Sequence, residues 1–168
     1  MKTMTLALAA TLLAAPAFAQ EVTPGSAKAL QDAFAAAIVA EDADALAALY
    51  TPDATSYGPE GDVAVGPAAI AASWAPLFEA FDGFTVSLDQ TGEMDMGDAH
   101  AAWGLWKMSA TLVGGDQPTN WEGRFTDVSV ATAEGWKYIV DHASPLAVIA
   151  IDDAPDDAPE DATGDTEE

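Results

Sequence analysis

The first part of the chain spaces its apolar residues as helices do. In residues 25–40 the apolar positions recur every four residues and fall on one face, which predicts an amphipathic helix. A second, shorter helix is expected to begin at Asp42 or Asp44, since either side chain can cap its first turn. Pro52 is expected to end it. A third is expected from Gly66-Pro67, because proline suits a first helical turn. The residues expected to face inward are Leu30, Phe34, Ile38, Leu46, Leu49, Tyr50, Ile70, Trp74, Leu77 and Phe78.

From Phe84 onward the pattern changes to a period of two. Phe84, Val86 and Leu88 alternate with polar residues, as a half-buried strand requires. Besides the strand that begins at Phe84, strands are expected at residues 54–58, 62–65, 99–113, 119–131 and 136–144. Helices followed by an antiparallel meander predict an α+β domain in which the helices pack on a sheet.

The two ends of the chain differ from this domain. Residues 1–19 have a basic start, a short apolar stretch and the small-x-small sequence of Ala17-Phe18-Ala19, which predict a secretory signal peptide. Residues 152–168 carry nine acidic side chains and are expected to form a disordered tail. Residues 20–151 are therefore expected to form one domain of a secreted or periplasmic protein.

Composition narrows the choice of partners. Cleavage after residue 19 would leave 4 basic and 28 acidic residues, a formal charge of 4 − 28 = −24. So acidic a chain is not expected to bind nucleic acid or anionic lipid by electrostatics, and no segment after residue 19 is apolar enough for membrane insertion. The absence of cysteine excludes disulfides and thiolate chemistry.

Three stretches of the sequence carry a resemblance to a known family. LAALYTPDATSYGPEG (residues 46–61) joins a helix to a strand, GRFTDVSV covers residues 123–130, and WKYIVDHAS covers residues 136–144. Together they resemble the nuclear-transport-factor-2-like superfamily, and its SnoaL-like branch in particular, along with the steroid isomerases and the association domain of calmodulin-dependent kinase. The resemblance implies a cone-shaped α+β fold whose curved, mostly antiparallel sheet and N-terminal helices enclose one pocket. It says little about function, because one scaffold hosts many activities.

The steroid-isomerase resemblance can be tested residue by residue. The position of that family's general base is Gly58 here, and the position of its oxyanion tyrosine is Phe34. Its oxyanion aspartate falls near Thr126, or on Asp127 if the turn differs by one residue. Proton abstraction beside a carbonyl needs a base and oxyanion donors. We therefore do not expect isomerase activity of that type.

Strand alternation supplies the candidate polar residues of the pocket. Arg124 and Thr126 share one side of their strand, and His142 and Ser144 share one side of the next. On the pocket side, Arg124 would clamp an anion, whereas the alternative role is an ion pair with a nearby carboxylate such as Glu122. His142 is the candidate general base, and the alternative is a structural hydrogen bond.

Aromatic residues are the candidate walls of the pocket. Tyr57, Trp74 and Trp106 are expected to line it, with core packing as the alternative role. The acidic residues around His100 occupy a turn and match no metal-binding spacing, so neither a metal nor a cofactor is expected.

The sequence thus predicts an exported domain that binds a small anionic or carbonyl-containing molecule in a partly apolar pocket. One alternative is a SnoaL-like isomerase, cyclase or hydrolase that uses His142. A second alternative is a scaffold that forms a homodimer through the sheet. Whether the chain is an enzyme stays open at this point.

Overall fold

Three helices open the part of the chain that the computed structural model describes, residues 24–146. They are α1 (Ala27–Val39), α2 (Ala43–Ala47) and α3 (Pro67–Ala80). Side chains cap the first two: Ala29 N donates to Ser26 Oγ at 3.1 Å, and Ala45 N donates to Asp42 Oδ1 at 2.8 Å. The caps satisfy N–H groups that have no partner within the first helical turn.

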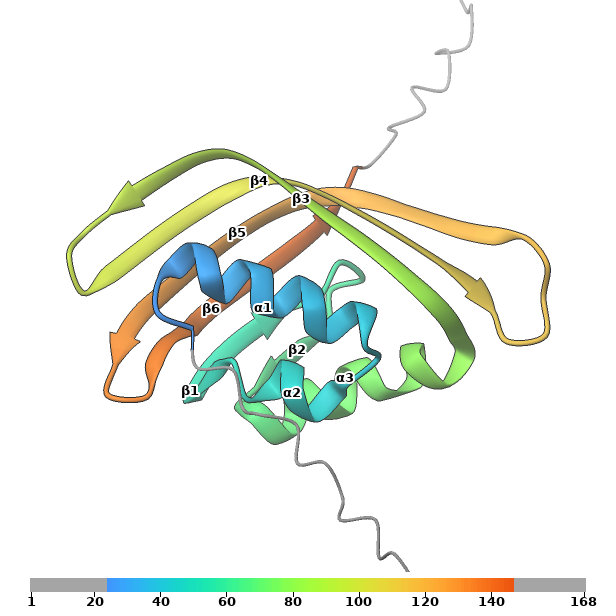
Figure 1. Ribbon diagram of the computed structural model, residues 1–168, viewed down its shortest axis with the longest axis horizontal. Coiled ribbons are helices and arrows are strands. Elements are labelled where there is room, and N and C mark those ends of the chain that lie inside the picture. Colours follow the sequence, from blue (N-terminus) through green and yellow to red (C-terminus); the bar gives the residue numbers. More distant parts are fainter. Residues whose placement is uncertain (1–23, 147–168) are drawn as a thin grey trace, which may run out of the picture.

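Six strands form one strongly curved sheet (Figure 1). They are β1 (Tyr50–Tyr57), β2 (Val63–Val65), β3 (Phe81–Asp95), β4 (Ala99–Leu112), β5 (Pro118–Thr132) and β6 (Gly135–Pro145). The strand order is β2-β1-β6-β5-β4-β3, and the β1–β6 pair is parallel while the other pairs are antiparallel. The long strands β3, β4 and β5 arch over the helices, so the sheet has an inner face toward the helices and an outer face away from them.

The hydrophobic core lies between the helices and the inner face. Leu30 and Ile38 of α1, and Ile70 of α3, are at most 1% exposed. They belong to one cluster with residues of the sheet, among them Phe84 of β3 and Tyr138 of β6. Because the helices pack on one face of the sheet only, the outer face is free of helices.

The predicted α+β architecture is confirmed, with one local correction. Tyr50 was expected on the second helix but begins β1, and Pro52 lies inside that strand. The pairing of β1 with β6 shifts register between Tyr50 and Thr55. Such an irregularity accommodates a proline, which has no N–H group to donate to the neighbouring strand.

Two predictions concern segments outside the described residues. The signal peptide at residues 1–19 and the acidic tail at 152–168 both fall there, as does the run 147–151 that was assigned to the domain. Within residues 24–146 no helix is sufficiently long and apolar to cross a bilayer.

Candidate functional site

A β-bulge in β6 decides which face its side chains occupy. Val128 of β5 pairs with Val140 of β6, but the next residue, Ser129, pairs with Tyr138, so Ile139 is the extra residue in β6. An extra residue reverses the alternation of side chains beyond it. Tyr138 therefore lies on the inner face with the core, whereas Val140 and the alternate residues after it lie on the outer face.

The predicted polar set lies on the outer face. Arg124 pairs with Ser144, and Thr126 pairs with His142, so the four residues do share one face as predicted. However, Arg124, Thr126 and His142 are exposed, while the alternate residues of β5 are buried. The prediction that this set faces the enclosed side is wrong. On β5 the buried parity is that of Phe125 and Asp127, and on β6 the bulge at Ile139 separates His142 from the buried Tyr138. Whether the set binds a ligand from outside stays a prediction.

The alternative role of Arg124 is not observed either. Among the ion pairs of residues 24–146, none joins its guanidinium to Glu122 or to another carboxylate within 4.0 Å. An exposed arginine without a partner is a weak basis for an enclosed anion site, since its charge is screened by solvent.

The three predicted aromatic walls occupy three different environments. Tyr57 is 43% exposed on the outer face, with its ring 6.0 Å from that of His142. Trp74 packs inside the helix layer, stacked on Phe78 at 5.6 Å. Trp106 lies on the inner face, where its Nε1 donates to the carbonyl oxygen of Arg124 at 3.1 Å. Trp106 is the one of the three that lines a groove, at the end of β6.

The inner face carries a polar cluster that replaces the predicted one. Asp127 of β5 and Asp141 of β6 are direct cross-strand partners, which places their Cβ atoms about 5 Å apart. Asp127 is 5% exposed and accepts a hydrogen bond from Gln31 Nε2 of α1 at 3.3 Å. Asp141 accepts from the hydroxyl of Tyr50 at 2.8 Å and from that of Ser56 at 3.3 Å. We call Asp127 and Asp141 the carboxyl pair.

Burial raises the pKa of both members of the carboxyl pair. The pKa of Asp127 rises from 3.8 to about 6, because desolvation outweighs the hydrogen bond from Gln31 and the nearby His100, which lower it. The pKa of Asp141 also rises from its ordinary value through burial, while the hydroxyls of Tyr50 and Ser56 oppose the shift. Asp127 is therefore poised to exchange a proton in the range where carboxyl groups are normally ionised.

His100 lies next to the carboxyl pair on the inner face. It pairs across the strands with Ser129, which is 1% exposed and two residues from Asp127. Its Nε2 lies 3.3 Å from a carboxylate oxygen of Glu93, whereas its buried Nδ1 has no hydrogen-bond partner among the described residues. His100, rather than His142, is thus the histidine that adjoins the buried acids.

A groove of about 390 Å³ opens beyond the end of β6. Its lining residues are Pro59, Glu60, Trp106, Asn120, Trp121, Glu122 and Pro145, and we call it the tryptophan groove. Pro145 lies four residues after Asp141 along β6, or about 13 Å at the usual strand rise. The cross-strand pair of Phe125 and Ala143 lies between the groove and the carboxyl pair.

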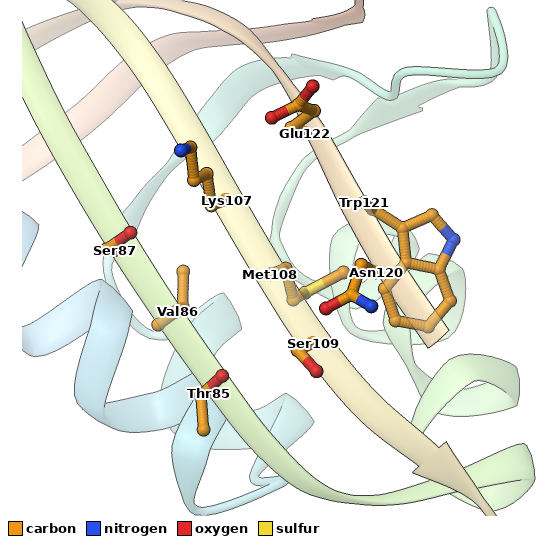
Figure 2. A pocket seen from close by; sticks show the side chains of 9 residues that line it. All are labelled: Thr85, Val86, Ser87, Lys107, Met108, Ser109, Asn120, Trp121 and Glu122. Atoms are coloured by element: carbon orange, nitrogen blue, oxygen red, sulfur yellow. The ribbon is translucent and has the colours of Figure 1, made fainter. Parts of the chain in front are cut away.

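A second groove, of about 630 Å³, runs across β3, β4 and β5 (Figure 2). Figure 2 shows hydroxyl groups of Thr85, Ser87 and Ser109 along it, with Lys107 and Glu122 as cross-strand partners. These polar residues alternate with Val86, Met108 and Trp121, which pack against the core. The pattern is that of a hydrated outer sheet face, and no buried titratable group lines this groove.

Sequence reasoning missed the carboxyl pair although one signal for it was present. Asp127 appeared only as the alternative to Thr126, and Asp141 was not considered for the pocket. Asp127 lies on the same side of the strand as Gly123 and Phe125, whereas the intervening residues Arg124 and Thr126 are polar. Small and aromatic residues on one side of a strand indicate its buried face, so this parity was the better guide.

Sequence comparison now places the fold in a family. The family model for the SnoaL-like domain matches residues 31–142, which include most of α1, strands β1 to β5 and all but the last three residues of β6. The chain belongs to the SnoaL-like family. No sequence among the curated proteins matches this chain.

Solved structures agree with a SnoaL-like domain of the nuclear-transport-factor-2-like superfamily. A superfamily protein from Salmonella enterica is 20% identical, with a TM-score of 0.64 over 74% of this chain and 92% of that one. A ketosteroid isomerase-like protein from Erwinia carotovora is 21% identical, with a TM-score of 0.63 over 77% and 99%. A Thiobacillus denitrificans protein assigned as a calcium/calmodulin-dependent protein kinase type II association domain is 26% identical, with a TM-score of 0.60 over 73% and 97%.

Proposed function

We propose that this SnoaL-like domain binds a small molecule from its inner side, where the carboxyl pair supplies the polar contacts. Family and fold support a ligand-binding or enzymatic domain. The observation that carries the proposal is the pairing of the buried Asp127 with the half-buried Asp141 on neighbouring strands. Buried carboxyl groups with raised pKa values are costly to keep and are concentrated at functional sites.

The charge of the inner side argues against the anionic ligand that the sequence predicted. The basic side chains of residues 24–146 are those of Lys28, Lys107, Arg124 and Lys137, and none of them bonds to the carboxyl pair or lines the tryptophan groove. Carboxylates accept hydrogen bonds and repel anions. The ligand is therefore an uncharged or positively charged molecule with O–H or N–H donors, and below pH 6 a protonated Asp127 also donates to a carbonyl oxygen.

Three ligands with one ring test this proposal. Cyclohexanol and cyclohexylammonium should raise the melting temperature of the protein at millimolar concentration, and cyclohexanecarboxylate should not, because only the carboxylate opposes the charge of the site. Ligand binding to the folded state stabilises it by RT ln(1 + [L]/Kd), so thermal melts over a concentration series report the affinity. Asp127→Asn should weaken the response to cyclohexanol. A larger response to the carboxylate than to the alcohol would contradict the proposal.

Enzymatic proton transfer is the alternative that one observation favours. A carboxyl group with a pKa near 6 is suited to act as a general acid or base near neutral pH. In that case Asp127 performs the transfer in place of His142, whose imidazole lies on the outer face. The export predicted from residues 1–19 stays a prediction beside either function.

Homodimer formation through the sheet is the remaining proposal. Trp103 and Leu105 of β4 lie on the outer face, 40% and 37% exposed, in the rows that contain Thr126 and Arg124. Exposed aromatic and aliphatic residues on a sheet face free of helices are typical of an interface between protein subunits.

Leu105→Lys should dissociate such a dimer, because a charge would have to be buried without a partner. Sedimentation velocity at micromolar concentration should then show a monomer for Leu105→Lys and a dimer for the wild type. The matched control is Val39→Lys, which adds the same charge at a residue that is 53% exposed at the end of α1. A monomeric wild-type protein would rule this proposal out.

A further inference from the structure

The tryptophan groove offers two aromatic rings that are already fixed in position. The ring of Trp106 lies against Gly123 and is held by the hydrogen bond from its Nε1 to the backbone. The ring of Trp121 packs edge-on against Phe81, with centroids 5.1 Å apart. Because both rings are held by other contacts, a ligand that binds between them does not have to order them first.

The rim of the groove is acidic. Glu60 lies in the exposed turn between β1 and β2, and Glu122 lies on β5, and both line the groove. The remaining lining consists of Asn120 and two prolines, with no basic side chain. The whole chain carries a formal charge of −23, so its field attracts cations toward such a groove.

We propose that the tryptophan groove binds a small organic cation, an alkylated or primary ammonium group. A cation against an indole face is stabilised by the charge distribution of the ring, and a carboxylate nearby adds direct attraction. Proline surfaces supply apolar contact for the methyl groups of an alkylammonium ion. This inference rests on the proposed function only in taking the domain to be one that binds small molecules. It adds that the ligand carries a positive charge, and it does not require Asp127.

Choline and its uncharged analogue 3,3-dimethylbutan-1-ol provide the sharpest test. The two molecules have nearly the same shape and carry the same hydroxyl group. They differ only in that a carbon atom of the alcohol replaces the ammonium nitrogen of choline. Titration calorimetry on the wild-type protein should show at least tenfold tighter binding of choline, and added salt should weaken choline more than the alcohol. Equal affinity for both would overturn the proposal, because the groove would then be a plain apolar surface.

Variants locate the binding site. Trp121→Leu should weaken choline binding about tenfold or more, whereas Trp121→Phe should retain most of it, because the aromatic face is kept. Glu60→Lys should weaken choline binding to a similar degree and is not expected to affect folding, since Glu60 is exposed. The control Glu134→Lys makes the same charge change at an exposed residue outside the groove and should bind choline as the wild type does.

The outcomes separate this inference from the proposed function. If choline binding is unchanged in both Trp121→Leu and Glu60→Lys, the cation binds elsewhere and the inference falls. The proposed function is tested independently by the cyclohexanol response of Asp127→Asn. A weakened cyclohexanol response in Asp127→Asn, beside failure of the choline test, would therefore leave the carboxyl pair in place as a ligand site and remove only the cation site.

Discussion

Between pH 4 and pH 6 the domain should lose about 2 kcal/mol of unfolding free energy through Asp127 alone. The folded-state pKa of Asp127 is about 6, and its ordinary value is 3.8. Within this window the folded protein binds more protons than the unfolded chain, so stability falls as the pH rises, by at most about 1.4 kcal/mol per pH unit. The contribution is fully present only well below the ordinary pKa of 3.8 and is lost as the pH rises through the folded-state pKa of about 6. Asp141, whose pKa is also raised, adds to the fall.

Asp127→Asn isolates this effect, because an amide of the same shape does not titrate. Urea unfolding at several pH values should show a difference between wild type and variant that decreases by about 2.4 kcal/mol from pH 4 to pH 7. Asp89→Asn is the matched control: Asp89 is exposed on β3, and its replacement should preserve the wild-type slope. A parallel pH profile for Asp127→Asn would show that Asp127 is ionised at little cost in the folded protein.

Local periodicity accounts for how much of the fold the sequence could predict. The helix expected over residues 25–40 is α1, and the strands expected at 99–113 and 136–144 are close to β4 and β6. Each depends on neighbours within a few residues of sequence, where spacing of 3.6 or 2 fixes which side chains share a face. The family resemblance then placed these elements in one α+β architecture.

The β6 half of the candidate site could not be predicted equally well, because its location depends on a single irregularity. Counting alternate residues back from His142 puts Tyr138 on the same side, and Tyr138 is in fact buried. The bulge at Ile139 breaks that count, so the buried side changes from Tyr138 to Asp141. A bulge is set by packing across strands and leaves little trace in the strand that contains it.

On β5 the predicted anion site resulted from taking the face of Arg124, rather than that of Asp127, as the pocket side. Arg124 and Asp127 lie three residues apart on one strand and therefore point to opposite faces. The face that holds Arg124 is open to solvent, and the face that holds Asp127 is covered by helices. The expected ligand therefore changes. A basic group would attract anions, whereas the acidic groups favour cations and hydrogen-bond donors.

Gly123→Ala should destabilise the domain and should also displace the Trp106 ring from the tryptophan groove. A Cβ atom at this position would lie 2.6 Å from Cε2 of Trp106 and closer still to the carbonyl oxygen of Ser144. The Trp106 ring can move, but Ser144 belongs to the strand paired with Arg124 and cannot withdraw without weakening the sheet. Overpacking of this kind costs about 1–3 kcal/mol, and contact with backbone places this site at the upper end of that range.

Unfolding in urea and choline titration measure the two consequences of Gly123→Ala separately. Gly25→Ala is the control, because a Cβ atom there meets no atom within 4 Å, and its stability should stay within about 0.5 kcal/mol of the wild type. Gly123→Ala should lose close to 3 kcal/mol, and its remaining folded fraction should bind choline more weakly because the Trp106 ring has been displaced. Wild-type stability in Gly123→Ala would mean that β6 and Trp106 are not packed against Gly123, and the groove would then lose one of its two walls.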